Sequence, residues 1–149
     1  MSELIIKNGY VFDPISGIKG DKADIAIKDG KIVEKVSSKA KTIDASGKTV
    51  MAGGVDIHTH VVGPKVNLGR EMRPEDKLFR GEYRGGIVKQ GKRMEMGFSI
   101  PTTWKTGYAY SRLGYTYVNE AAMPPLMAPH VHEEIRDTPI LDISAMPVF

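Results

Sequence analysis

Two histidines separated by a single residue, His58 and His60, are the side chains whose type and spacing are suited to chemistry. They end a mostly apolar stretch that begins at Val50 and passes through two glycines. Because side chains alternate between the faces of a β-strand, both imidazoles should point the same way, and Asp56 should join them. Two imidazoles on one face can share one metal ion, and imidazole nitrogen suits zinc. The spacing therefore predicts metal ligands at the end of a strand.

The same pair could also be two ordinary polar residues on a half-exposed strand. The apolar, glycine-bounded run before the pair indicates a buried strand, however, and a buried strand rarely carries histidines without partners for their nitrogens. This favours metal ligands over ordinary polar residues. At the C-terminal end of a parallel barrel strand, the pair would lie where such folds keep their active sites.

Composition excludes several classes of site. The chain has no cysteine, so disulfides, thiolate metal sites and iron–sulfur ligation by this chain are excluded. No apolar run approaches 18 residues and the N-terminus does not resemble a signal peptide, so we expect a cytoplasmic protein without a membrane span. A formal charge of +3 is too small to indicate nucleic-acid binding.

The elements that position the histidines are expected in two domains. Residues 1–52 predict a small antiparallel β domain of the sandwich type, which forms a platform and carries no chemistry. Hairpins are expected at Asn8-Gly9 and Asp29-Gly30, since both dipeptides favour two-residue turns with positive φ, and a looser pair across 45–47.

Residues 53–149 predict α/β structure, the opening βα units of a barrel. After the strand that ends at His60, a helix over 101–113, with Gly114 just past its end, and a strand over 115–122 imply a parallel pair, and another helix is expected over 129–136. A complete eight-unit barrel needs about 250 residues, so 149 residues are too few for it. The apolar run at the end also leads us to expect a fragment, or a chain that needs another polypeptide.

A long basic loop is expected over about 61–91, directly after the histidines. Between Lys65 and Arg93 the sequence has nine basic residues and four acidic ones. Long loops in compact domains tend to be lids or insertions. A merely solvated loop is the alternative, because charged loops are common.

The β platform, the Asp-x-His-x-His strand end and the βα units together resemble the opening of the amidohydrolase superfamily. Within it, the sequence is similar to the A subunits of formylmethanofuran dehydrogenase and of the related formyltransferase/hydrolase complex. The stretches that carry this similarity are 51–60, 63–67, 73–76, 106–108 and 120–125.

The resemblance implies a binuclear zinc site in a TIM barrel, with His58 and His60 as ligands and the other ligands on later strands. It implies interconversion of formate plus methanofuran with N-formylmethanofuran, in methanogenesis or C1 oxidation, beside subunits that carry tungsten or molybdenum and iron–sulfur clusters. The isolated chain would then be inactive. Asp56 would support a ligand imidazole, and the carboxylates of methanofuran would meet residues of the basic loop: Lys65, Asn67, Arg70, Arg73 and Lys77.

Other interpretations stay open. The chain could be a fragment of a cyclic amidohydrolase of the dihydroorotase or hydantoinase kind, or a non-catalytic interaction chain of a larger complex. His130 and His132 could have a capping or surface role, or complete a four-histidine zinc site. Glu120 could lie at the barrel mouth or pair with Arg112 or another base.

Overall fold

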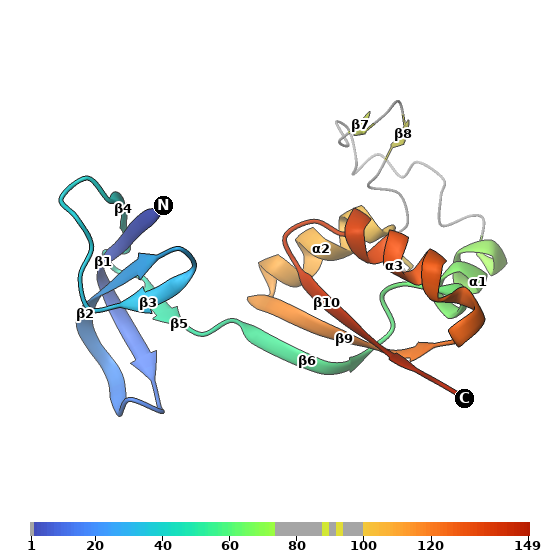
Figure 1. The fold of residues 1–149 in the computed structure, drawn as a ribbon, viewed down its shortest axis with the longest axis horizontal. Helices are drawn as coiled ribbons and strands as arrows, with labels where there is room; N and C mark the ends of the chain where they lie inside the picture. Colours follow the sequence, from blue (N-terminus) through green and yellow to red (C-terminus); the bar gives the residue numbers. More distant parts are fainter. Residues whose placement is uncertain (1, 74–87, 90–91, 94–99) are drawn as a thin grey trace. The chain divides into compact units, whose positions relative to one another are not determined.

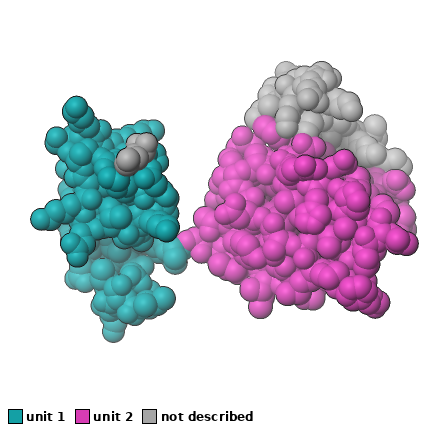
Figure 2. All heavy atoms as spheres, viewed as in Figure 1, with its two compact units in different colours: residues 1–52 teal, residues 53–149 magenta. Residues whose placement is uncertain are grey.

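The chain divides into two compact units, residues 1–52 and 53–149 (Figures 1 and 2). The computed structural model describes residues 2–73, 88–89, 92–93 and 100–149. The boundary between the units coincides with the one expected from the sequence.

A single five-stranded mixed sheet makes up the first unit. Its strands are β1 (Glu3–Asp13), β2 (Ile18–Lys28), β3 (Lys31–Val33), β4 (Lys41–Asp44) and β5 (Thr49–Met51). The first three pair antiparallel, whereas β4 and β5 each pair in parallel with β1. The expectation of a wholly antiparallel domain is therefore wrong, and residues 2–52 form one sheet rather than the two facing sheets of a sandwich.

The turn signals of this unit have two different outcomes. The Asp29-Gly30 hairpin is confirmed, with φ of 49° and 77° between β2 and β3. The Asn8-Gly9 hairpin is wrong, because β1 continues through Asn8 and shifts its register against β2 between Ile6 and Gly9. Asn8 does have a positive φ of 63°, but the residue serves a β-bulge instead of a turn.

Three parallel strands form the sheet of the second unit, in the order β10-β9-β6. They are β6 (Gly54–Thr59), β9 (Tyr115–Met123) and β10 (Asp142–Pro147). Helices α2 (Thr103–Arg112) and α3 (Ala128–Asp137), the latter preceded by a 3₁₀ turn at Pro125–Met127, lie over one face of this sheet (Figure 1). Each strand of this sheet pairs in parallel with the strand of the next βα unit along the chain, β6 with β9 and β9 with β10. The predicted βα order and the predicted parallel pair are therefore confirmed.

One helix lies where the sequence predicts none. Helix α1 (Pro64–Met72) occupies the first part of the expected basic loop, so the prediction of an irregular stretch is wrong there. Gly63, with φ of 90°, lets the chain turn out of the strand, and Pro64 then begins the helix. Further along, β7 (Val88–Lys89) pairs with β8 (Lys92–Arg93). Residues 74–87 and 90–91 of the expected loop, with Lys77, lie outside the described residues.

The core of the second unit fixes the chain immediately after His60. Val61 and Val62 are buried, in one cluster with residues of β9, α3 and the segment before β10: Val118, Met123, Val131 and Leu141. Full burial of an apolar side chain of this size stabilises by about 1.5–3 kcal/mol. Within the described residues no helix has the length and apolar character needed to cross a membrane.

Candidate metal site

The two histidines are neighbours in space. The ring centroids of His58 and His60 lie 5.7 Å apart in an edge-on arrangement. The strand that carries them is not buried in the described residues, however, because Val55 and Ile57 are 59% and 75% exposed. The prediction of a buried strand is therefore wrong.

Asp56 bonds to Tyr110 and to the backbone of His58 rather than to either imidazole. The Tyr110 hydroxyl lies 3.2 Å from Asp56 Oδ2, to which it donates, and 2.7 Å from Thr59 Oγ1. Strict alternation would place residues 56 and 59 on opposite faces, but the register of β6 against β9 shifts between them. Asp56 Oδ1 accepts from the His58 backbone N–H at 3.2 Å. The Asp56 carboxylate thus supports the backbone of His58 rather than its imidazole.

Glu120, near the end of β9, is the partner of His60. Its carboxylate oxygen Oε1 lies 2.8 Å from His60 Nδ1. The side chain is 1% exposed and also accepts from the backbone amides of Val61, Val62 and Ala122, at 2.8, 3.2 and 3.1 Å. Because a carboxylate only accepts, a neutral imidazole in this contact carries its proton on Nδ1 and has a free lone pair on Nε2. Of the bases expected as a partner of Glu120, the structure thus places His60 beside it, and not Arg112.

Asn119 holds the same segment of β6 at a second point. Its amide nitrogen donates to the carbonyl oxygen of Ile57 at 3.2 Å. Its amide oxygen accepts from Ser144 Oγ at 2.6 Å, and the hydroxyl of Tyr117 donates to the same Ser144 oxygen at 2.5 Å. The hydrogen-bonded series therefore crosses all three strands and ends next to His58. The sequence analysis does not predict a role for Asn119. The signal that could have found it is the pair Asn119-Glu120 inside a strand, because polar residues are unusual in a strand interior.

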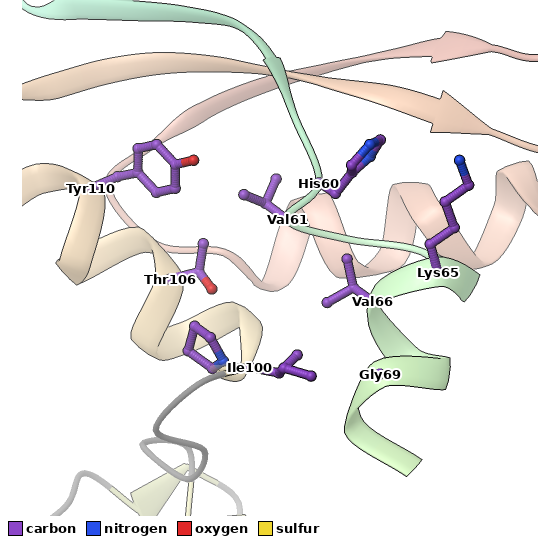
Figure 3. A pocket seen from close by; sticks show the side chains of 9 residues that line it. His60, Val61, Lys65, Val66, Gly69, Ile100, Thr106 and Tyr110 are labelled. Atoms are coloured by element: carbon purple, nitrogen blue, oxygen red, sulfur yellow. The ribbon is translucent and has the colours of Figure 1, made fainter. Parts of the chain in front are cut away.

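A pocket of about 470 Å³ adjoins His60, between the end of β6, α1 and α2 (Figure 3). The polar side chains on its wall are those of His60, Lys65, Thr106 and Tyr110. Burial is the main cause that raises the pKa of the Tyr110 hydroxyl. The hydrogen bond with Thr59 lowers this pKa, and the nearby Asp56 carboxylate raises it further. Tyr110 therefore keeps its proton and acts as a donor.

The other predicted substrate-binding residues have different surroundings. Arg70 donates to Glu134 Oε1 at 3.2 Å, to Asn67 Oδ1 at 2.6 Å and to the Pro101 carbonyl oxygen. Burial lowers the pKa of this guanidinium, and Glu134 partly offsets the effect. Arg70 and Asn67 thus connect α1 to α3 and to the start of α2, while Arg73 is exposed at the end of α1.

The second pair of histidines lies on α3. His130 Nε2 is 2.9 Å from the amide nitrogen of Asn67 and 3.8 Å from Glu134, and both contacts lie outside the His58–His60 pair. Across residues 2–73 and 100–149 no three His, Asp or Glu side chains form a group that could hold a metal ion. The four-histidine site is therefore not formed. His58 and His60 suit zinc as donors, but a catalytic zinc needs a third protein ligand.

The fold and the histidine pair define a class of protein. Residues 41–146 match the model of the amidohydrolase family, and the chain belongs to that family. It is 59% identical to the protein FwdA of Methanocaldococcus jannaschii, over 99% of this chain and 25% of FwdA. It is 36% identical to one component of the formyltransferase/hydrolase complex Fhc of Methylorubrum extorquens, over 96% of this chain and 25% of that component, which we call the Fhc relative. The chain thus spans about a quarter of the length of these relatives.

Solved structures agree with this assignment. The crystal structure of the FhcABCD complex from Methylorubrum extorquens, bound to methylofuran, matches 99% of this chain and 25% of the matched chain, with a TM-score of 0.77 and 33% identity. A dihydroorotase of Aquifex aeolicus is 43% identical, but over only 43% of this chain. The similarity to FwdA and to the Fhc relative therefore includes almost the whole chain, whereas the similarity to this dihydroorotase includes less than half of it.

Proposed function

We propose that this chain is the N-terminal part of a zinc-dependent subunit that interconverts formate plus methanofuran with N-formylmethanofuran, in a complex of the formylmethanofuran dehydrogenase type. The observation that carries the proposal is the His58–His60 pair, with His60 held at Nδ1 by buried Glu120, a contact that leaves the Nε2 lone pair of the neutral imidazole for a metal. The extent of similarity to FwdA and the Fhc relative supports the choice of substrate.

His58 and His60 would hold part of a binuclear zinc site, at the mouth of a TIM barrel that later strands complete. When bound, such metal ions polarise the formyl carbonyl and lower the pKa of water. In the hydrolytic direction the C–N bond of the N-formyl group breaks. The oxygen of water enters formate, and the amine of methanofuran takes up a proton.

The pocket beside His60 gives the chain's own residues a role in binding. Lys65 lies on its wall and is exposed, so its ammonium can meet a carboxylate of the long substrate. Of the other candidates, Asn67 and Arg70 already bond within the protein, and Arg73 lies at the end of α1. Lys65 is therefore the strongest of the proposed substrate-binding residues.

The proposal includes partners and location. The relative of known structure belongs to the FhcABCD complex. By resemblance we propose that the present protein works beside subunits that carry tungsten or molybdenum and iron–sulfur clusters, in the cytoplasm.

The test uses the full-length protein from its native source. Replacing both histidines, H58A/H60A, should abolish formylmethanofuran hydrolysis and lower the zinc content, whereas H130A, a histidine substitution away from the pair, should leave the zinc content intact. Zinc is measured by elemental analysis and formate release by a coupled assay. Wild-type activity in the double variant would contradict the proposal.

The same preparation separates the other candidates. A cyclic amidohydrolase would hydrolyse dihydroorotate or a hydantoin and leave formylmethanofuran unchanged. A non-catalytic interaction chain would co-purify with the complex, yet contain no zinc and show no hydrolysis of either substrate.

A further inference from the structure

Glu120 is the largest fully buried side chain among the described residues, and its ionisable group has no part in the proposed bond cleavage. It lies in β9, sixty residues after His60 in the chain, and accepts four hydrogen bonds. Three come from backbone amides, which can only donate. The fourth comes from the ring of His60.

We propose that Glu120 is a positioning residue for a metal ligand, which fixes both the orientation and the tautomer of His60. The inference rests on the proposed function. The carboxylate binds Nδ1 of the ring and also the amides of Val61 and Val62, which directly follow the ring's own residue. The buried Glu120 carboxylate thus fixes the backbone next to His60 and also binds Nδ1, the ring nitrogen that faces away from the metal when Nε2 is the ligand. Carboxylates that accept from a ligand histidine tune metal affinity in this way.

The substitution E120Q tests this assignment because it replaces an acceptor with a group that must also donate. If the amide oxygen of Gln meets Val61 and Val62, its NH₂ faces His60 and selects the tautomer with the proton on Nε2. If the oxygen meets His60 instead, the NH₂ faces two backbone N–H groups. Either arrangement removes a contact that the carboxylate makes.

A matched control is available in Glu134 of α3. Its side chain is 14% exposed, accepts from the backbone amide of Gly63 and pairs with Arg70. The histidine that lies near it, at 3.8 Å, is His130 of the same helix rather than a member of the His58–His60 pair. E134Q therefore removes a partly buried carboxylate that holds the same connection after β6, while the contact between Glu120 and His60 stays in place.

The experiment compares the full-length wild-type, E120Q and E134Q proteins. Zinc affinity is measured by competition with a chromophoric chelator, metal-site geometry by the visible spectrum of the cobalt(II)-substituted protein, and fold by thermal unfolding of the metal-free protein. We expect both variants to unfold at a lower temperature. Only E120Q should lose about 10- to 100-fold in zinc affinity and show an altered cobalt spectrum.

Equal zinc affinity and equal cobalt spectra in E120Q and E134Q would overturn the assignment and leave Glu120 a purely structural role. If E120Q does not fold, E120D replaces it. The side chain of Asp is shorter, so in E120D the carboxylate should lie farther from the His60 ring, and zinc affinity should fall. Unchanged zinc affinity in E120D would also contradict the assignment. A wild-type protein that binds no zinc would contradict the proposed function itself, which separates the two failures.

Discussion

At the scale of single residues, two neighbours on β9 hold the end of β6. Asn119 donates to the carbonyl oxygen of Ile57, and Glu120 bonds to His60 and to the two amides that follow it. Successive residues of a strand point to opposite faces, so the two contacts hold β6 from both sides of the sheet. The short segment that contains both histidines is therefore fixed at its beginning and at its end.

Lys65 is the residue through which substrate recognition can be tested. In the full-length enzyme, K65M removes an ammonium from the pocket beside His60 and should raise KM for the long substrate by about 3- to 10-fold. We expect a modest effect because the Lys65 side chain is exposed, so that water and salt would screen its attraction to a substrate carboxylate. Zinc content should not change. KM is measured by steady-state kinetics, with K48M as the control because Lys48 is an exposed lysine of the first unit. Equal KM values for K65M and the wild-type protein would exclude Lys65 from substrate binding.

The sequence predicts the residues of this site unevenly, for a physical reason. The histidine pair is readable because residue type and strand alternation are local properties. Glu120 stays open between two roles at the level of sequence, because its partner His60 lies sixty positions away and only the strand pairing brings them together. Asp56 is expected to support an imidazole, but its carboxylate accepts from the His58 backbone amide and from Tyr110, contacts that the sequence pattern does not reveal.

At the scale of elements, the capping signals of α2 predict that helix correctly, whereas the pairing of β4 and β5 is predicted wrongly. Helix α2 has Thr102 as its N-cap, whose side chain accepts from the Lys105 amide, and Gly114 follows its C-terminus with φ of 85°. The strands β4 and β5 are expected from the sequence to pair with each other, but both pair with β1. No turn residue encodes that choice, since a partner strand far away in the sequence decides it.

The packing of α2 can be tested at Gly107, which is buried inside the helix. A Cβ atom at this position would lie 2.1 Å from the carbonyl oxygen of Pro139, a backbone atom that cannot move aside alone. We expect G107A to lower the free energy of unfolding by about 2 kcal/mol, since overpacking outweighs the gain of up to about 1 kcal/mol in helix propensity. Chemical denaturation is the measurement. S111A, at an exposed position of the same helix, should change little, and a stabilised G107A would contradict the packing seen here.

At the scale of the whole molecule, the three parallel strands of the second unit carry the two histidines that we propose as metal ligands. Neighbouring strands in the sheet follow chain order, as in the opening of a barrel, and this chain matches 25% of the length of each relative. Val55 and Ile57 of β6 are exposed apolar side chains here, and under the proposed function later strands of the barrel would cover them.

The proposal that later strands complete the metal site leads to the last prediction. Within residues 2–73 and 100–149 no three ligand side chains converge, and a catalytic zinc needs three protein ligands with one open position. The isolated 149-residue chain should therefore bind zinc at least about 100-fold more weakly than the full-length protein and show no formylmethanofuran hydrolysis. Chelator competition on both proteins gives the ratio, with H58A/H60A of the short chain as the baseline for adventitious binding. Zinc binding by the short chain as tight as that of the full-length protein would mean that the site is complete without later strands.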